Sequence, residues 1–236
     1  MGIQNHIKSF VVRSSKISDR IDKIYQAERS KYLIEFPQSP ESALIPDEHW
    51  SFYDSIGSLN KDELPLIIEI GTGQGDNFAK CAAEDPEHFY VGIEVYEPGI
   101  AHTVFLLNKG FESNDFEPVR NAAIIRADVF HLFKQNFFGT GADATDTFEV
   151  WIFFPDPWPK KKHHKRRLLD DEFKELIIAT FSKQPTIRIA TDIEDYAEQI
   201  SAVFNVNKTE RFDRRVLTNF EKKGLAKGRE ISDYTV

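Results

Sequence analysis

Short apolar runs alternate with amphipathic stretches over the middle of the chain, from residue 64 to residue 204. Each run is rich in β-branched or aromatic side chains, which is typical of strands, and the stretches between them repeat their apolar positions at helical spacing. The pattern predicts strands at residues 65–70, 88–94, 122–127, 148–154 and 186–191. It predicts helices near residues 76–83, 98–108, 130–136, 170–182 and 195–204.

This alternation predicts an α/β fold. Strands separated by single helices pair in parallel through right-handed crossovers, which gives a doubly wound sheet. The runs LIIEI and WIFF are apolar without interruption, as expected for strands that are buried on both faces. Residues 205–236 again have a mixed, basic composition, and we expect them to close the sheet with antiparallel strands.

The first 63 residues differ from the rest. Residues 1–31 alternate basic and apolar positions, and we interpret them as an arm. Residues 36–63 are rich in proline, serine and acids, which indicates a linker with one short helix. We therefore predict a basic N-terminal arm and linker over residues 1–63 and one α/β domain over residues 64–236.

Composition narrows the class of protein. The chain has 236 residues, one cysteine (Cys81) and no apolar run near the ~18 residues that a membrane helix needs. The opening MGIQNHIKSFVVR lacks the continuous apolar core of a secretion signal. We expect a cytoplasmic protein without a disulfide, a cysteine-based metal site or a membrane anchor.

The distribution of charge is more informative than its sum. The net charge is −8, from 30 basic and 38 acidic side chains. Residues 160–167 nevertheless hold six cations and no acid, residues 1–31 hold seven cations against three acids, and residues 205–230 hold eight against four. Lysine-rich segments are often only solvated surface, but three of them on an acidic chain can steer a polyanion to one face.

A glycine-rich turn follows the first predicted strand. In IIEIGTGQGD, Glu69 ends the strand, and Gly71, Gly73 and Gly75 lie in the turn before a helix. Glycines there let the backbone approach a ligand in the crevice beyond the strand ends. The G-x-G-x-G spacing differs from the dinucleotide fingerprint G-x-G-x-x-G and resembles the first motif of Rossmann-like S-adenosylmethionine methyltransferases. A turn with a purely structural role remains the alternative.

Acids also end the next two strands. FYVGIEV ends in Glu94, where nucleotide-binding sheets place a carboxylate on ribose hydroxyls. AAIIRAD ends in Asp128, which such methyltransferases would set beside the adenine amino group. Each acid alone could be a helix cap or a loop residue. Acids at three successive strand ends, all facing one crevice, favour a binding site.

The fourth strand leads into FPDPWPKKKHHKRRLL, the most informative segment. Proline on both sides of Asp156 stiffens the chain and holds the carboxylate at the rim of the sheet. The cations that follow suit phosphate contacts. His163 and His164 lack the spaced partners of a metal site, so we interpret them as RNA-contacting or exposed.

These motifs resemble the bacterial-type tRNA (guanine-N7-)-methyltransferases (TrmB) along nearly the whole chain. The family run F-P-D-P-W-x-K-x-x-H-x-K-R-R is matched by Phe154, Pro155, Asp156, Pro157, Trp158, Lys160, His163, Lys165, Arg166 and Arg167. The C-terminal motif T-x-F-E-x-[KR]-G is matched by Thr218, Phe220, Glu221, Lys223 and Gly224. The family's Thr-Asp and Tyr-Ala pairs stand at residues 191–192 and 196–197, and the arm segment KSFVVR is similar as well.

The resemblance implies transfer of a methyl group from S-adenosylmethionine to guanine N7 in tRNA, at guanosine 46 of the variable loop, with Asp156 as the catalytic residue. It implies cofactor binding by Glu69, Gly71, Gly73, Gly75, Glu94, Asp128 and Asp156. It implies substrate contacts from Lys160, Asp192, Thr218, Asn219, Phe220 and Glu221. It implies RNA contacts from Lys162, His163, His164, Lys165, Arg166 and Arg167. We expect neither a metal nor an obligatory protein partner.

Two other functions stay open, and three departures from the family affect loops. Asp156-Pro157-Trp158 faintly resembles the D-P-P-Y/W loop of exocyclic-amine methyltransferases, and a non-catalytic RNA-binding protein could keep the same fold. Val216 stands where proline is expected, and Gln184-Pro185 replaces a glycine pair. An acidic insertion occupies residues 139–147.

Overall fold

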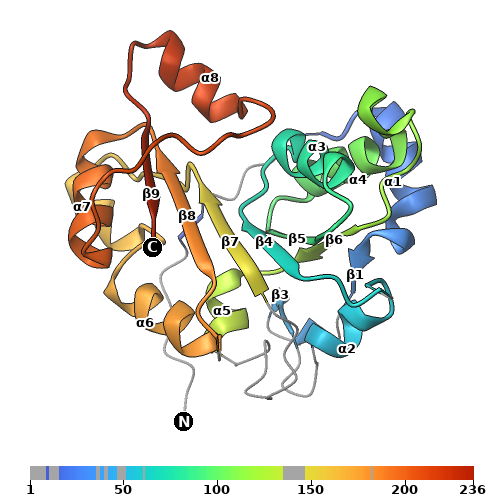
Figure 1. Ribbon diagram of the computed structural model, residues 1–236, viewed down its shortest axis with the longest axis horizontal. Coiled ribbons are helices and arrows are strands. Elements are labelled where there is room, and N and C mark those ends of the chain that lie inside the picture. Colours follow the sequence, from blue (N-terminus) through green and yellow to red (C-terminus); the bar gives the residue numbers. More distant parts are fainter. Residues whose placement is uncertain are drawn as a thin grey trace.

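A seven-stranded sheet forms the centre of the protein (Figure 1). The computed structural model describes residues 9–10, 16–35, 38–39, 42–46, 52–60, 62–134, 147–181 and 183–236. The sheet order is β1-β6-β5-β4-β7-β8-β9, and every neighbouring pair is parallel except β8 and β9. Its strands are β1 (Leu33–Ile34), β4 (Leu66–Ile70), β5 (Phe89–Glu94), β6 (Ala122–Arg126), β7 (Thr147–Phe153), β8 (Thr186–Thr191) and β9 (Ser232–Thr235). A separate hairpin joins β2 (Gln38–Ser39) to β3 (Ser42–Pro46).

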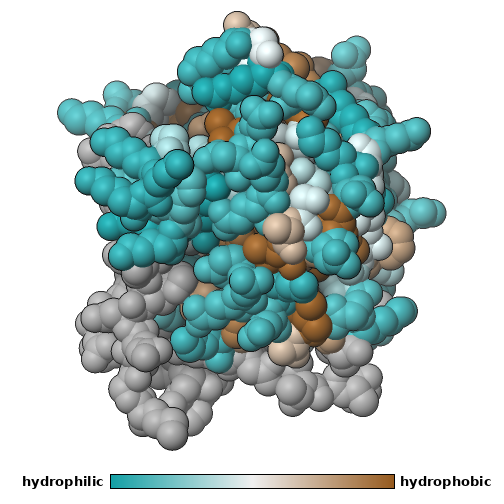
Figure 2. All heavy atoms as spheres, turned by 90° about the vertical axis from the view of Figure 1, so that its left-hand side faces the viewer, coloured by the Kyte–Doolittle hydropathy of each residue, from teal (hydrophilic) through white to brown (hydrophobic). Residues whose placement is uncertain are grey.

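Helices cover both faces of the sheet, and each face has its own apolar core. One face packs against α1 (Asp19–Glu28), α3 (Asp76–Glu84) and α4 (Glu97–Lys109). The other packs against α2 (Phe52–Gly57), α5 (Val129–Lys134), α6 (Asp171–Thr180) and α7 (Glu194–Phe204). The remaining elements are α8 (Asn219–Ala226) and the 3₁₀ turns η1 (Arg29–Lys31), η2 (Glu112–Asn114) and η3 (Lys161–Arg166). Seen from the side of α7, the surface is largely hydrophilic (Figure 2).

The strand order creates a switch point between β4 and β7. From β4 the chain builds outward through β5 and β6 on one side, and from β7 it builds through β8 on the other. Crossovers therefore diverge at the carboxyl ends of β4 and β7, and a crevice opens there between the loops. Both strands are central and lie beneath helices on both faces, which explains their almost continuous burial.

The sequence prediction of the fold is confirmed. All five predicted strands are present with bounds that differ from the observed ones by at most one residue at either end, and all five predicted helices are present. Residues 135–136 and 182 of two predicted helices, and residues 139–146 of the insertion, lie outside the described residues. Within the described residues, the C-terminal segment supplies a single antiparallel strand, β9, and one isolated bridge between Thr209 and Asp233, where the sequence led us to expect several strands.

Parts of the predicted arm and linker join the body of the domain. Helix α1 packs against α4, and β1 pairs with β6 as an edge strand of the sheet. Helix α2 is the short helix that the sequence predicts between residues 36 and 63. The division at residue 63 stays a prediction. Among the described residues, none of the helices is both long and apolar enough to cross a membrane.

Candidate active site

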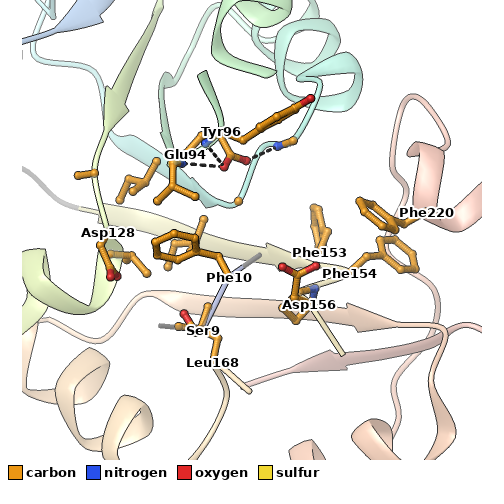
Figure 3. Close-up of a pocket in the computed structure, with 18 residues that line it drawn as sticks. Ser9, Phe10, Glu94, Tyr96, Asp128, Phe153, Phe154, Asp156, Leu168 and Phe220 are labelled. Carbon is orange, nitrogen blue, oxygen red and sulfur yellow. Dashed lines mark hydrogen bonds between the residues drawn. The ribbon is translucent and has the colours of Figure 1, made fainter. Parts of the chain in front are cut away.

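A cavity lies at the carboxyl ends of four neighbouring strands, at the switch point (Figure 3). The ends of β4, β5, β6 and β7 each contribute backbone or side chains to its wall. The lining residues are Ser9, Phe10, Ile70, Gly71, Gly73, Ile93, Glu94, Val95, Tyr96, Ala127, Asp128, Val129, Phe153, Phe154, Pro155, Asp156, Leu168 and Phe220. Three of the predicted carboxylates, those of Glu94, Asp128 and Asp156, therefore share one cavity.

The glycine turn divides into two roles. Gly71 and Gly73 have φ values of +80° and +60°, and no atom lies within 4 Å of the Cβ that either would carry, so they leave open space beside the cavity. Gly75 does not line the cavity. It has a φ of +74° and begins α3, and a Cβ there would stand 2.1 Å from Thr103 Oγ1 on α4. Gly75 therefore permits close packing of α3 against α4.

Glu94 ties the second strand to the glycine turn. Its Oε2 accepts a hydrogen bond from Gly73 N at 2.7 Å, and its Oε1 accepts from Val95 N at 2.6 Å and Tyr96 N at 2.9 Å. Burial raises the pKa of the Glu94 carboxyl above its usual value, while these three backbone donors oppose the rise. A carboxylate has about four lone-pair sites, so one stays available to a ligand hydroxyl.

Asp128 combines both roles that the sequence leaves open. Its Oδ1 accepts a hydrogen bond from Phe130 N at 3.1 Å, which holds the first turn of α5. The side chain is only 7% exposed, and the residue still lines the cavity. The cap fixes the carboxylate in place, so its remaining acceptor sites are pre-oriented for a ligand donor.

Asp156 stands on a strained turn after β7. Phe154 has a φ of +53° and Trp158 a φ of +44°, in the left-handed region that bulky residues rarely occupy. The turn is anchored because Phe154 N donates to Ala190 O of β8 at 2.8 Å, and Pro155 and Pro157 restrict the backbone on either side of Asp156. Together they hold the carboxylate at the cavity rim, as the sequence predicts.

The start of the chain reaches the same cavity, which the sequence reasoning missed. The indole Nε1 of Trp158 donates to Ser9 O at 2.9 Å, and Figure 3 shows Phe10 beside the wall between Asp128 and Asp156. The available signal was the arm segment KSFVVR, which we interpreted as a basic arm similar to that of the family, without placing it at the cavity.

Glu69 lies beneath the glycine turn and does not line the cavity. On β4, Ile68 and Ile70 belong to one core and Ile67 to the other, so strand alternation places Glu69 on the α3 face with Ile67. Its side chain is 3% exposed, and Oε2 has no hydrogen-bond partner among the described residues. Burial, with the nearby Glu94 charge, raises its pKa to about 8. The structure thus separates Glu69 from the three carboxylates of the cavity.

The basic run forms η3 and its flanks, and its members are not equivalent. Lys160, Lys161, Lys162 and Lys165 are exposed. His163 and His164 are half-buried; burial and the neighbouring cations lower the pKa of His163. The Arg166 guanidinium lies over the Trp158 ring, 4.9 Å from its centroid.

The structure contradicts the prediction that Arg167 contacts RNA. Its side chain is 1% exposed, four of its N–H donors bond oxygens within the protein, and the fifth faces His164 Nε2. Nε donates to Pro157 O, Nη1 to Asp195 O and Gln199 Oε1, and Nη2 to Asp195 Oδ2, with His164 Nε2 at 3.2 Å. Arg167 joins the turn that carries Asp156 to α7, and it has no donor left for a phosphate.

The predicted substrate residues at α8 also divide. Phe220 lines the cavity, and Asn219 is exposed. Thr218 caps α8 by accepting from Glu221 N at 3.1 Å. Glu221 is fully buried and bound to arginines, so a direct substrate contact from it is wrong for this structure. Asp192 lies beside α8, where its Oδ2 accepts from Arg229 at 2.6 Å. Lys160 is exposed at the start of η3 and does not line the cavity.

The charge of the cavity indicates what it can hold. Its described lining has three carboxylates and no lysine, arginine or histidine. Such a wall repels the pyrophosphate of a dinucleotide and attracts a cation that carries hydroxyl and amino donors. S-adenosylmethionine has a sulfonium, a ribose diol and two amino groups. The residues present therefore fit it, with Glu94 for the ribose, Asp128 for the adenine and Gly71 and Gly73 for close backbone approach.

Comparison with known proteins agrees with this chemistry. A family described as "Putative methyltransferase" matches residues 63–234. The tRNA (guanine-N(7)-)-methyltransferase of Bifidobacterium longum subsp. infantis is 35% identical, over 97% of this chain and 87% of that protein. The enzyme of the same name from Legionella pneumophila strain Corby is 33% identical, over 98% of this chain and 97% of that one.

Solved structures show the same fold at low sequence identity. An antibiotic-related methyltransferase has a TM-score of 0.51 and 17% identity, over 78% of this chain and 92% of that one. The 16S rRNA methyltransferase KamB has a TM-score of 0.52 and 13% identity, over 80% and 95%. The fold and the carboxylate-lined cavity thus define a Rossmann-like class I methyltransferase. Within that class, the chain belongs to the family of tRNA (guanine-N(7)-)-methyltransferases.

Proposed function

We propose that this protein transfers a methyl group from S-adenosylmethionine to N7 of guanosine 46 in the variable loop of tRNA, in the cytoplasm. The observation that carries the proposal is the cavity of three carboxylates with Asp156 at its rim, close in sequence to the exposed lysines of η3. The names of the relatives support the reaction and the class of RNA.

The residues of β4, β5 and β6 bind the cofactor in this proposal. Glu94 accepts a hydrogen bond from a ribose hydroxyl, and Asp128 accepts one from the adenine amino group. Gly71 and Gly73 let the backbone approach the amino-acid end, because a side chain at either would fill the open space beside it. The cofactor, when bound, supplies an electrophilic methyl group on a positively charged sulfur.

Asp156 orients the target base. Guanine N7 has a free lone pair, so no general base needs to remove a proton before attack. The product base carries a positive charge, and a carboxylate already fixed by Pro155 and Pro157 stabilises that charge without reorganising. Positioning of N7 in line with the methyl group supplies the rest of the rate enhancement. Because the base must leave its contacts in the folded tRNA, displacement costs about a few kcal/mol.

The exposed lysines of the basic run contact the phosphates. Lys160, Lys161, Lys162 and Lys165 present ammonium groups to solvent, whereas Arg167 does not. Replacing all four by Ala should flatten the dependence of log affinity on log salt by up to about 3 units, since each lost phosphate contact removes about 0.7–0.9. Filter binding between 50 and 200 mM salt measures this slope. A slope within about 0.5 of wild type would remove these lysines from the interface.

A product assay tests the reaction itself. The protein is incubated with methyl-labelled S-adenosylmethionine and unmodified tRNA, and the product is cleaved by borohydride and aniline, which break the chain at N7-methylguanosine. Cleavage at guanosine 46, abolished in a tRNA with adenosine there, is the expected result. Label on an exocyclic amine would support the amino-methyltransferase alternative, and binding without turnover would support a non-catalytic RNA-binding protein.

A further inference from the structure

A buried group of charges lies behind the wall of the cavity that carries Asp156. The side chains of Arg214 and Glu221 are fully buried, and that of Asp233 is 4% exposed. Arg214 Nε and Nη2 donate to the two oxygens of Glu221 at 3.1 and 2.9 Å, and Nη1 donates to Asp233 Oδ1 at 2.5 Å. We call these three residues the Arg214 cluster.

The cluster joins three segments that are distant in sequence. Glu221 lies in the first turn of α8, and Asp233 lies in β9 at the edge of the sheet. Arg214 comes from the irregular chain between α7 and α8. Because the guanidinium is planar and donates two parallel hydrogen bonds to Glu221, it fixes the direction of α8 as well as its distance.

The same guanidinium touches the cavity wall. Its central carbon lies 5.3 Å from the centroid of the Phe153 ring and 5.5 Å from that of Phe154. Both phenylalanines line the cavity immediately before Pro155 and Asp156, and Phe220, the neighbour of Glu221, lines it from α8 (Figure 3). The cluster therefore contacts the turn that carries Asp156 directly. It holds Phe220 through Glu221, the next residue in α8.

The carboxylates on the cofactor side are held differently. Glu94 accepts backbone hydrogen bonds from Gly73 in the glycine turn and from Val95, and Asp128 accepts one from Phe130, so none of these bonds involves the Arg214 cluster. A change at Arg214 should therefore disturb the Phe154–Asp156 turn and Phe220 while leaving the ribose and adenine contacts in place.

We propose that Arg214 is a positioning residue, which sets the place of α8 and of the Asp156 turn against the target base. The inference rests on the proposed function, since it assigns this half of the cavity to the base. An error of about 1 Å in such placement costs about 10²-fold in rate, so loss of the guanidinium should act mainly on kcat.

The test compares Arg214 with a second arginine, Arg188, whose side chain is partly buried. Arg214→Lys keeps the charge and removes the two-pronged contact, and Glu221→Gln weakens the same contact from the other side. Arg188→Lys is the matched control: Arg188 also donates two hydrogen bonds to a buried acid, Glu149, at 2.8 and 2.6 Å, and lies 4.5 Å from the ring of Phe212. Neither Arg188 nor Glu149 lines the cavity.

Kinetics on tRNA give the first readout. We expect Arg214→Lys and Glu221→Gln to lower kcat about 10- to 100-fold, while the KM for S-adenosylmethionine changes less than about threefold. Arg188→Lys should keep kcat within about twofold of wild type. Wild-type kcat in Arg214→Lys, or an equal loss in Arg188→Lys, would overturn the proposal, because the cluster would then affect only general stability.

Hydrogen exchange gives a second readout that needs no activity. Arg214→Lys should increase exchange in residues 219–226 and 154–158, and Arg188→Lys, whose neighbour Phe212 stacks on Phe153, should leave these segments unchanged. If Arg214→Lys does not fold, Glu221→Gln gives the same comparison. Unchanged exchange in both variants overturns the proposal. Absence of wild-type turnover on tRNA would contradict the proposed function instead, and the exchange result would still decide whether Arg214 positions these segments.

Discussion

The two halves of the cavity are built differently. On the β4–β5–β6 side, the carboxylates of Glu94 and Asp128 stand at strand ends and face the cavity themselves. On the β7–α8 side, two charged residues of the motifs are turned inward: Arg167 binds α7, and Glu221 binds Arg214. In the first half, the motif carboxylates line the cavity themselves. In the second half, Arg167 and Glu221 do not line the cavity but hold the segments that do.

Loss of Asp156 should have the largest effect on the reaction. Asp156→Ala removes the rim carboxylate from a half-buried position that creates no core cavity, so the fold should persist. Loss of one pre-organised electrostatic partner typically costs 10²–10³ in rate, and we expect a fall of about that size in kcat. Single-turnover assays with a parallel melting curve measure it. Normal turnover would make Asp156 a structural terminator of β7.

Variants of Arg167 and Lys165 should distinguish a residue that stabilises the fold from one that contacts RNA. Arg167→Ala leaves the Pro157 carbonyl and Gln199 without their partner, and we expect a loss of about 2–4 kcal/mol in the free energy of unfolding; Asp195 is half-exposed, which reduces the cost. Lys165 is exposed, so Lys165→Ala should change the free energy of unfolding by less than about 0.5 kcal/mol. Urea titration measures both. Equal stabilities would contradict the inward role of Arg167.

A variant of Glu94 tests the half of the cavity whose residues bind the cofactor directly. Glu94→Ala should weaken binding of S-adenosylhomocysteine by about 1.5–3 kcal/mol, or about 10- to 100-fold, because a charged acceptor is lost from the ribose. Glu94→Gln keeps the shape and one acceptor oxygen, and should lose less. Affinity for tRNA should not change. Calorimetric titration measures the cofactor side, and an unchanged dissociation constant in the alanine variant would contradict the assignment.

The prediction for Glu69 concerns stability, and its size depends on pH. Burial raises its pKa to about 8 in the folded protein, against 4.5 for a free carboxyl. Between these pH values only the folded state keeps the proton, so wild-type stability falls as the pH rises. Glu69→Gln stays neutral, so its advantage in unfolding free energy should grow by up to about 1.4 kcal/mol per pH unit and level off above pH 8.

Urea titrations at pH 5.5, 7 and 8.5 measure this difference. The same substitution at the exposed Glu87, Glu87→Gln, is the control for the change of side chain. A constant difference between Glu69→Gln and wild type across this range would show that Glu69 is ionised in the folded protein.

The same contrast explains how far the sequence alone could predict the site. Glu94 and Asp128 were placed correctly because strand periodicity and parallel order determine where a strand ends. Arg167 and Glu221 were assigned wrongly because their partners, Asp195 and Arg214, become neighbours only in the folded chain. The two-residue strand β1 and the packing of Ser9 on Trp158 also depend on contacts that no local pattern encodes.

The sheet order also has a consequence for synthesis of the protein. Strand β5 pairs with β4 after one helix, but β7 pairs with β4 only after two further strands have been made. During translation, the strands of the cofactor half can therefore pair while the residues around Asp156 are still untranslated. Asp233 lies in β9, which follows all the other described elements, so the wall that faces the base is completed later than the cofactor half. We expect nascent chains to acquire cofactor-binding surfaces well before they can act on RNA.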